Sequence, residues 1–315
     1  MFLQHNTLDG LRDYFNDALV DRFSESEIKL MFKAFVMKRM SLTETDFMLT
    51  RGLSKPLQSN KEGKRQFHST EVRFSESDLL YFRSVVKRLQ AEEPFQYVHG
   101  RTEFYGLELI CDKRALIPRP ETEELVDWIV ESSNEEDELR IVDICAGSGC
   151  IAFGIKSVLK NAQVEAWELS SEALELINEN RKLTGLEINS TKMDALSEGY
   201  PAKSNYYDVI VSNPPYIPHS DRTKMEANVL EHEPGMALFV EDDDPFVFYK
   251  RIVEEASELL VDGGALYFEI HEDYEKEVIA CFEEYPFVNI ELRKDLQGRS
   301  RMIRGQRVPS RHEQK

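Results

Sequence analysis

The chain has few cysteines, and none of them stands in a metal-binding or disulfide pattern. Only four occur in 315 residues: Cys111, Cys145, Cys150 and Cys281. They form no C-x-x-C pair, and no cluster of His and Cys has the spacing of a zinc site. Free thiols in a reducing compartment are the expected state. We therefore expect neither a disulfide framework nor a bound metal.

The sequence also lacks a long hydrophobic run. No apolar stretch approaches the roughly 18 residues that a membrane helix needs. The N-terminus carries acidic residues early, where a signal peptide would have an uninterrupted apolar segment. We therefore expect a soluble, cytoplasmic protein. A hydrophobic fraction of 41% can form a sizeable core, and the length of 315 residues favours two domains.

Positive charge is in deficit. Lys and Arg number 39 against 58 Asp and Glu, which leaves a formal charge of -19. A broad contact with a nucleic-acid backbone needs a basic surface, so this balance disfavours one without excluding a local basic groove. A basic or neutral protein partner fits the charge better.

Residues 1–92 are predicted to form a helical domain. Apolar side chains recur at helical spacing from Leu8 to Leu19, and capping boxes begin at Ser24 and Ser75. Residues 51–70 are polar and basic, which is typical of a loop.

The rest of the chain predicts a hairpin linker over residues 93–113, an α/β domain over residues 114–306 and a tail at 307–315. Strand-like and helix-like segments alternate in the α/β domain, which favours a Rossmann-like parallel sheet with helices on both faces. The expected strands are 141–145, 164–169, a weaker 187–192, 207–212 and 265–270, with 288–292 and 300–303 as an antiparallel edge. The expected helices are 122–132, 150–160, 171–184, 245–261 and 273–284.

A glycine turn follows the first of these strands and predicts a cofactor site. Asp143 lies within the strand, and Gly147 and Gly149 allow the chain to turn sharply beside a ligand. Glu168, at the end of the next strand, can accept hydrogen bonds from ribose hydroxyls, and Asp194 can accept from an adenine amino group. The turn by itself is compatible with either a dinucleotide or S-adenosylmethionine.

The tetrapeptide Asn213-Pro214-Pro215-Tyr216 decides between these cofactors. It follows the apolar strand 207–212, and its two prolines stiffen the backbone and leave carbonyls free to accept. The Asn213 side-chain oxygen and the Pro214 carbonyl suit the two hydrogens of a planar –NH2 group, and Tyr216 offers it a flat face. Hydride transfer needs no such motif. The motif therefore indicates an S-adenosylmethionine-dependent methyltransferase that acts on an amide or exocyclic amine.

At these residues the sequence resembles the HemK/PrmC family of protein-(glutamine-N5) methyltransferases. The resemblance covers about residues 93–305. It rests on the segments Glu103–Gly106, Leu116–Glu123 (L-I-P-R-P-E-T-E) and Val211–Ile217 (V-S-N-P-P-Y-I), with Glu269-Ile270 further along. The sequence departs from the family at three positions: Cys145 replaces a glycine, Glu168 an aspartate and His271 a glycine.

The resemblance implies that the substrate is the glutamine of the Gly-Gly-Gln loop in class I peptide-chain release factors, and that the helical domain helps to grip it. It places the cofactor loop on Cys145, Ala146, Gly147, Ser148 and Gly149, behind Asp143, with Glu168, Asp194, Ala195 and Asn213 completing the cofactor site. It implies that the glutamine amide is held by Asn213, Pro214, Pro215 and Tyr216. It implies that Phe104 and Arg119 line the substrate channel, although core packing for Phe104 and a surface ion pair for Arg119 are equal alternatives.

Other functions stay open on the sequence alone. One is glutamine methylation of a ribosomal protein, another is N6-adenine or RNA methylation, and a third is a non-catalytic adaptor that retains the cofactor fold. Two histidines attract attention without a catalytic pattern. We expect a structural role for His271 and a solvated charged loop around His232 and Glu233.

Overall fold

The computed structural model describes residues 6–52, 57–59, 65–67, 73–200, 202–225 and 227–308. The chain divides into two compact units, Met1–His99 and Gly100–Lys315. Each unit has its own buried core, so each is described by itself. No helix within the described ranges is long and apolar enough to cross a membrane.

The first unit is helical, as predicted. Its helices are α1 (Leu8–Leu19), α2 (Glu25–Met40), α3 (Glu44–Gly52), α4 (Glu76–Gln90) and α5 (Phe95–His99). Ser24 and Ser75 form the expected capping boxes, each accepting from the backbone N–H three residues on. Phe15 is fully buried at the centre of the core, with edge-on contacts to Phe32 and Phe82.

The loop expected over residues 51–70 is wrong where the structure describes this stretch. Helix α3 continues to Gly52. Two short strands, β1 (Leu57–Ser59) and β2 (Arg65–Phe67), then pair antiparallel. The remaining positions of the predicted loop lie outside the described residues.

A hairpin opens the second unit, and it is shorter than the predicted linker. Strands β3 (Arg101–Phe104) and β4 (Leu107–Ile110) pair antiparallel around Tyr105 and Gly106. Both turn residues have positive φ, 52° and 71°, which is the geometry of a type I′ turn. Residues 95–99, which we placed in the hairpin linker, instead form helix α5.

The second unit is built on a seven-stranded sheet of order β12-β13-β11-β8-β5-β6-β7. Strands β5 to β8 and β11 run parallel, and β12 and β13 form the predicted antiparallel edge. The sequence located every strand, including the weak one, but placed the start of β11 late and the end of β13 early. The strands are β5 (Arg140–Ile144), β6 (Gln163–Glu168), β7 (Asn189–Lys192), β8 (Tyr207–Ser212), β11 (Leu260–Glu269), β12 (Phe287–Lys294) and β13 (Ser300–Arg307).

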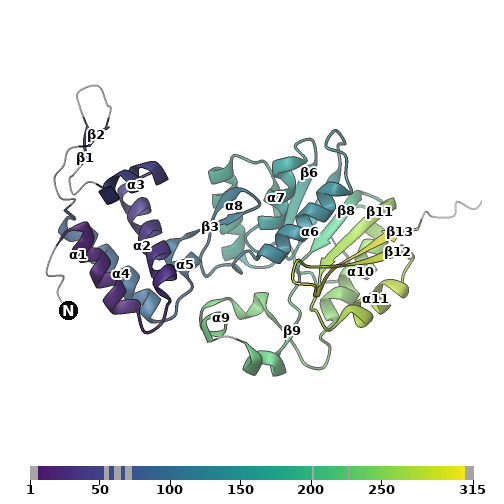
Figure 1. Cartoon of the computed structure of the whole chain (residues 1–315). Helices are drawn as coiled ribbons and strands as arrows, with labels where there is room; N and C mark the ends of the chain where they lie inside the picture. Colours follow the sequence, from purple (N-terminus) through teal and green to yellow (C-terminus); the bar gives the residue numbers. More distant parts are fainter. Residues whose placement is uncertain are drawn as a thin grey trace, which may run out of the picture. The chain divides into compact units, whose positions relative to one another are not determined.

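Helices cover both faces of this sheet (Figure 1). Side chains alternate along β5, so Ile141 joins one core cluster and Val142 the other. The first face carries α6 (Pro120–Glu131), α7 (Cys150–Val158) and α8 (Ser171–Thr184), and the second carries α10 (Val247–Leu259) and α11 (Glu275–Glu283). Helix α6 begins two residues earlier than predicted, because Pro120 is well suited to the first helical turn.

A segment between β8 and α10 departs from the simple alternation. It contains two short strands that pair parallel, β9 (Ile217–Pro218) and β10 (Phe239–Val240). Between them lie the 3-10 turns η1 (His219–Lys224) and η2 (Gly235–Ala237) and the short helix α9 (Ala227–His232). The segment brings Pro234, Met236 and Ala237 to the wall of the pocket described next.

Candidate active site

A pocket lies at the carboxyl ends of the central parallel strands, where ligands bind in open α/β sheets. Its empty volume, including the open mouth, is about 940 Å³. Its walls come from the turn after β5, the end of β6, the turn after β7, the start of the N-P-P-Y segment and residues 114–119. The predicted site residues that line it are Arg119, Cys145, Ala146, Gly147, Ser148, Glu168, Asp194, Ala195, Asn213 and Pro215.

The glycine turn is held in an unusual backbone conformation. Residues 145, 147 and 149 all have positive φ, at 61°, 55° and 79°. Glycine adopts such angles freely, whereas Cys145 does so at a cost of roughly 1–2 kcal/mol. Burial raises the pKa of the Cys145 thiol, so it faces the pocket uncharged. The turn therefore accommodates Cys145 in the left-handed conformation, at the position where the family that the sequence resembles has glycine.

A side chain at position 149 is disfavoured for two reasons: the positive φ angle and the close neighbouring side chains. A Cβ there would lie 3.0 Å from the ring of Phe153 and 3.3 Å from Ile177. We expect Gly149→Ala to lower the unfolding free energy by roughly 2–5 kcal/mol, from left-handed strain and overpacking together. Gly185→Ala is the matched control, since Gly185 has φ +68° but nothing within 4 Å of its Cβ. Denaturant titration of both variants measures the difference, and equal losses would show that crowding contributes nothing.

Glu168 supports the glycine turn directly. Its Oε2 accepts from the Gly147 N–H and its Oε1 from the Ser170 N–H, both at 2.8 Å. Burial is the main cause that raises the pKa of this carboxyl, and the backbone donors oppose it. Each carboxylate oxygen has a second lone pair, so Glu168 can hold the turn and still accept from a ligand in the pocket.

Asp143, predicted as a cofactor residue, lies behind the turn. It is fully buried, and its Oδ2 accepts from the Ala152 N–H of α7 at 3.3 Å. Burial raises the pKa of this carboxyl well above its ordinary value, and nearby Glu168 adds to the effect. Its Oδ1 and the Oγ of pocket-lining Ser148 have no hydrogen-bond partner among the described residues. Buried polar atoms without partners are rare, so the Ser148 hydroxyl is well placed to bind a polar ligand group.

The turn after β7 forms the far wall of the pocket. Asp194 accepts from the Leu196 N–H at 2.9 Å through Oδ1, and the buried Ala195 carbonyl accepts from the Tyr200 hydroxyl at 2.6 Å. Both residues line the pocket, together with the neighbouring Met193. This part of the wall is therefore apolar with one carboxylate.

The N-P-P-Y segment leaves the sheet at the end of β8. Ser212 donates to the Ile144 carbonyl at 2.6 Å, which joins this strand end to the start of the glycine turn. Asn213 is half-buried, and Pro214 and Pro215 are buried. The Tyr216 hydroxyl donates to Glu269 Oε1 at 3.3 Å. The fold thus brings Asn213 and the glycine turn to one pocket.

Arg119 lines the pocket and makes an ion pair, but the pair is not on the surface. Its guanidinium lies 2.6 Å from Glu233 Oε1, and the Glu233 side chain is only 1% exposed. The other oxygen, Oε2, accepts from the Ile117 N–H at 3.1 Å. The solvated loop expected around Glu233 is therefore wrong, because this residue fastens the segment after α9 to residues 117–119.

Phe104 does not fulfil the substrate-channel expectation. It is 1% exposed and belongs to the core cluster on the α6–α7 face of the sheet. A Cβ at Gly154 would lie 3.3 Å from its ring and from Val126, so both helices enclose it. Core packing, the alternative interpretation, accounts for this residue.

His271 has the structural role that we expected. Its Nδ1 accepts from the Asp273 N–H at 3.2 Å, and its ring packs against Tyr274 and the edge of Tyr216. Burial lowers the pKa of this imidazole. Each of the four cysteines is a free thiol, as predicted. Within the part of the chain that the structure describes, no group of three His, Cys, Asp or Glu side chains could hold a metal ion.

Sequence reasoning missed Thr122 and Glu233 as parts of the site. Thr122 stands in the P-R-P-E-T-E segment, and Glu233 in the segment that we expected to be a solvated loop. Their partners, Glu269 and Arg119, lie more than 100 residues away in sequence. No local pattern identifies a contact of that range.

The sheet order, with the glycine turn and the N-P-P-Y segment at one pocket, defines a Rossmann-like methyltransferase. Residues 123–234 match the family described as the methyltransferase small domain. The release factor glutamine methyltransferase of Flavobacterium psychrophilum is 36% identical over 94% of this chain and 98% of its own length. That of Bacteroides thetaiotaomicron is 43% identical over 71% of this chain and 80% of its own. The chain belongs to the release factor glutamine methyltransferase family.

Proposed function

We propose that this protein transfers a methyl group from S-adenosylmethionine to N5 of the glutamine in the Gly-Gly-Gln loop of class I peptide-chain release factors. The observation that carries the proposal is the position of Asn213, which lines the same pocket as the glycine turn at the carboxyl edge of the sheet. Family membership supports this substrate over an adenine or a ribosomal protein. The proposed place of action is the cytoplasm, where release factors work.

The residues of the pocket fit the proposed cofactor. Glu168 has lone pairs for ribose hydroxyls, Asp194 for an adenine amino group, and the Ser148 hydroxyl is a buried polar group without a partner among the described residues. Gly147 leaves room for a ligand, since a Cβ there would have only Ala115 within 4 Å, at 3.9 Å. When bound, S-adenosylmethionine supplies a methyl group already activated on a sulfonium, so no metal is needed.

The chain's own task is to orient the acceptor nitrogen. The lone pair of an amide nitrogen is delocalised, which makes it a poor nucleophile. The Asn213 side-chain oxygen and the Pro214 carbonyl are proposed to accept the two N–H hydrogens and so to fix the amide in the pocket. Pro215 lines the pocket with an apolar ring beside the proposed position of the amide. We further propose that the helical unit, Met1–His99, helps to grip the release factor.

Methyl transfer from labelled S-adenosylmethionine to a purified release factor tests the function. We expect label on the intact factor and none on a factor whose Gly-Gly-Gln glutamine is changed to alanine. Ribosomal protein and RNA are offered in parallel reactions. Label on either of these, with none on the release factor, would contradict the proposed substrate while retaining the methyltransferase chemistry.

A further inference from the structure

A series of hydrogen bonds at the pocket wall connects the first and last residues of N-P-P-Y, and two of its members, Thr122 and Asn213, line the pocket. Its centre is Glu269, at the end of β11, which is 3% exposed. Glu269 Oε2 accepts from the Thr122 hydroxyl at 2.6 Å, and Oε1 accepts from the Tyr216 hydroxyl at 3.3 Å. Thr122 Oγ1 in turn accepts from the Asn213 side-chain Nδ2 at 3.5 Å. The four side chains come from α6, β11 and the segment after β8.

Counting the available protons shows which group donates and which accepts at each of these hydrogen bonds. An ionised carboxylate can only accept, so the single hydroxyl proton of Thr122 is committed to Glu269. Thr122 Oγ1 is then left with lone pairs alone, and the group that it can bind on Asn213 is the amide NH2. With Nδ2 engaged by Thr122, the Oδ1 of Asn213 is the atom available to a ligand in the pocket that both residues line.

We propose that Thr122 and Glu269 are positioning residues that fix the amide of Asn213 with its oxygen available to the acceptor nitrogen. The inference rests on the proposed function, since it concerns how that site orients a glutamine amide. Thr122 lines the pocket itself, whereas the buried Glu269 is connected to it through the Thr122 hydroxyl. Their effect passes through Asn213, which would otherwise present NH2 and oxygen interchangeably to a group that requires only an acceptor.

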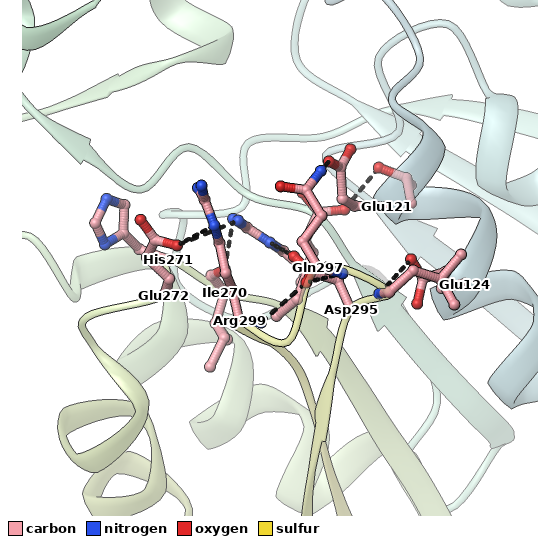
Figure 2. Close-up of polar contacts among 12 residues, drawn as sticks. Glu121, Glu124, Ile270, His271, Glu272, Asp295, Gln297 and Arg299 are labelled. Carbon is pink, nitrogen blue, oxygen red and sulfur yellow. Dashed lines mark hydrogen bonds and ion pairs between the residues drawn. The ribbon is translucent and has the colours of Figure 1, made fainter.

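The elements that carry the two residues are fastened to each other. Figure 2 shows the turn between β12 and β13 bonded to the start of α6 and to the residues after β11. Gln297 Nε2 donates to Glu121 Oε1 at 3.4 Å, and Arg299 Nε lies 3.2 Å from Glu272 Oε2. Glu121 immediately precedes Thr122, and Glu272 follows Glu269 by three positions. The turn therefore contacts both elements that carry the hydroxyl and the carboxylate, next to the bond between them.

The charge state of Glu269 determines whether Thr122 donates to Glu269 and accepts from Asn213. Burial raises the pKa of this carboxyl, whereas the Thr122 hydroxyl bond, the Arg301 charge and the Tyr216 hydroxyl lower it, in that order, and Glu121 raises it. Tyr249 also faces this position and donates to the Glu269 carbonyl at 3.1 Å. Protonated Glu269 can donate to Thr122 and free the hydroxyl proton to turn toward Asn213. Turnover is therefore expected to fall as the pH falls through the raised pKa of Glu269.

Substitutions separate positioning from simple support of the fold. Thr122→Val removes the hydroxyl at nearly constant volume, and Glu269→Gln replaces an obligate acceptor by a group that can also donate. Each is expected to lower kcat about ten- to a hundredfold, the effect of losing a charge-assisted hydrogen bond. KM for the release factor and the affinity for S-adenosylmethionine are expected to stay unchanged. Thr122→Ser is expected to restore turnover.

The matched control is Thr184→Val, the same substitution in α8. Thr184 also donates its hydroxyl, to the Asn180 carbonyl at 2.9 Å, in a helix that carries none of the four residues. Its kcat is expected to equal that of the wild type. Wild-type activity is measured first, so its absence would contradict the proposed function rather than the positioning role.

A double-mutant cycle with Asn213→Ala gives the decisive result. If Thr122 acts through Asn213, then Thr122→Val has no further effect on single-turnover rates in the Asn213→Ala background. An additive loss would overturn the inference, as would wild-type kcat in Thr122→Val. Glu269→Gln preserves side-chain volume and provides the same cycle if Thr122→Val fails to fold. An unchanged acid limb in the pH profile of Glu269→Gln would also overturn it.

Discussion

Replacing Asn213 by alanine is expected to lower turnover by about 10²–10³, the scale for losing one pre-organised polar group aimed at the reacting atoms. The change removes the proposed side-chain acceptor of the substrate amide N–H and leaves the Pro214 carbonyl, the second proposed acceptor, in place. It also leaves Thr122 Oγ1 without its donor. The acceptor nitrogen then loses its orientation rather than its binding pocket, so kcat is expected to fall far more than KM for the release factor rises.

Asn161→Ala is the matched control for this experiment. Asn161 is exposed, follows α7 and donates to the Glu136 carbonyl at 3.4 Å, remote from the pocket lining. Steady-state transfer of labelled methyl groups to the release factor measures both variants, with thermal melting to show that each is folded. Turnover of Asn213→Ala within threefold of the wild type would remove Asn213 from the proposed mechanism.

The sequence predicted the sheet and the position of the pocket because both follow from local rules. Alternating strands and helices require a parallel sheet, and the carboxyl ends of such strands meet at one edge. The glycine turn, Glu168, Asp194 and Asn213 each follow a strand, so their convergence could be predicted without knowing any contact. The structure places them around the same pocket.

Asp143 and Phe104 are two residues for which this prediction from local rules fails. Both stand in motifs that resemble the family, but a motif specifies order along the chain and not which side of a strand faces a ligand. Asp143 points behind the turn to the Ala152 N–H, and Phe104 packs between α6 and α7. Their roles depend on which layer covers each face, and that is decided by packing over the whole sheet.

The bonds that support the site were the least predictable part. Thr122 binds Glu269 across 147 positions, and Arg119 binds Glu233 across 114. Each pair joins a residue that precedes β5 in the sequence to one that follows β5 by many positions. Helical and strand periodicity predict only local contacts, so neither pair could be predicted from them. Both pairs involve a buried carboxylate, and such a group requires partners because it is costly to desolvate alone. A charged residue in an otherwise apolar strand end, as at Glu269, was the one local signal available.

Replacing Glu168 by glutamine is expected to weaken binding of S-adenosylmethionine about ten- to a hundredfold, the effect of losing charge-assisted hydrogen bonds. The carboxylate accepts from the Gly147 and Ser170 N–H groups and is proposed to accept from the ribose as well. A glutamine amide has one acceptor atom, so its NH2 would meet one of these backbone donors. The glycine turn and the ribose of the cofactor then lose the carboxylate that is proposed to bind both.

Calorimetric titration at several pH values checks this prediction, with Glu172→Gln as the control. Glu172 is an exposed carboxylate in the first turn of α8, so its variant removes one charge near the site without touching the turn. Because burial raises the pKa of Glu168, wild-type affinity is expected to fall as the pH falls through that pKa, where protonation removes an acceptor. In Glu168→Gln this acid limb is expected to vanish. Equal losses of affinity in both variants would mean that Glu168 acts only through its charge, and not as the shared acceptor of turn and ribose.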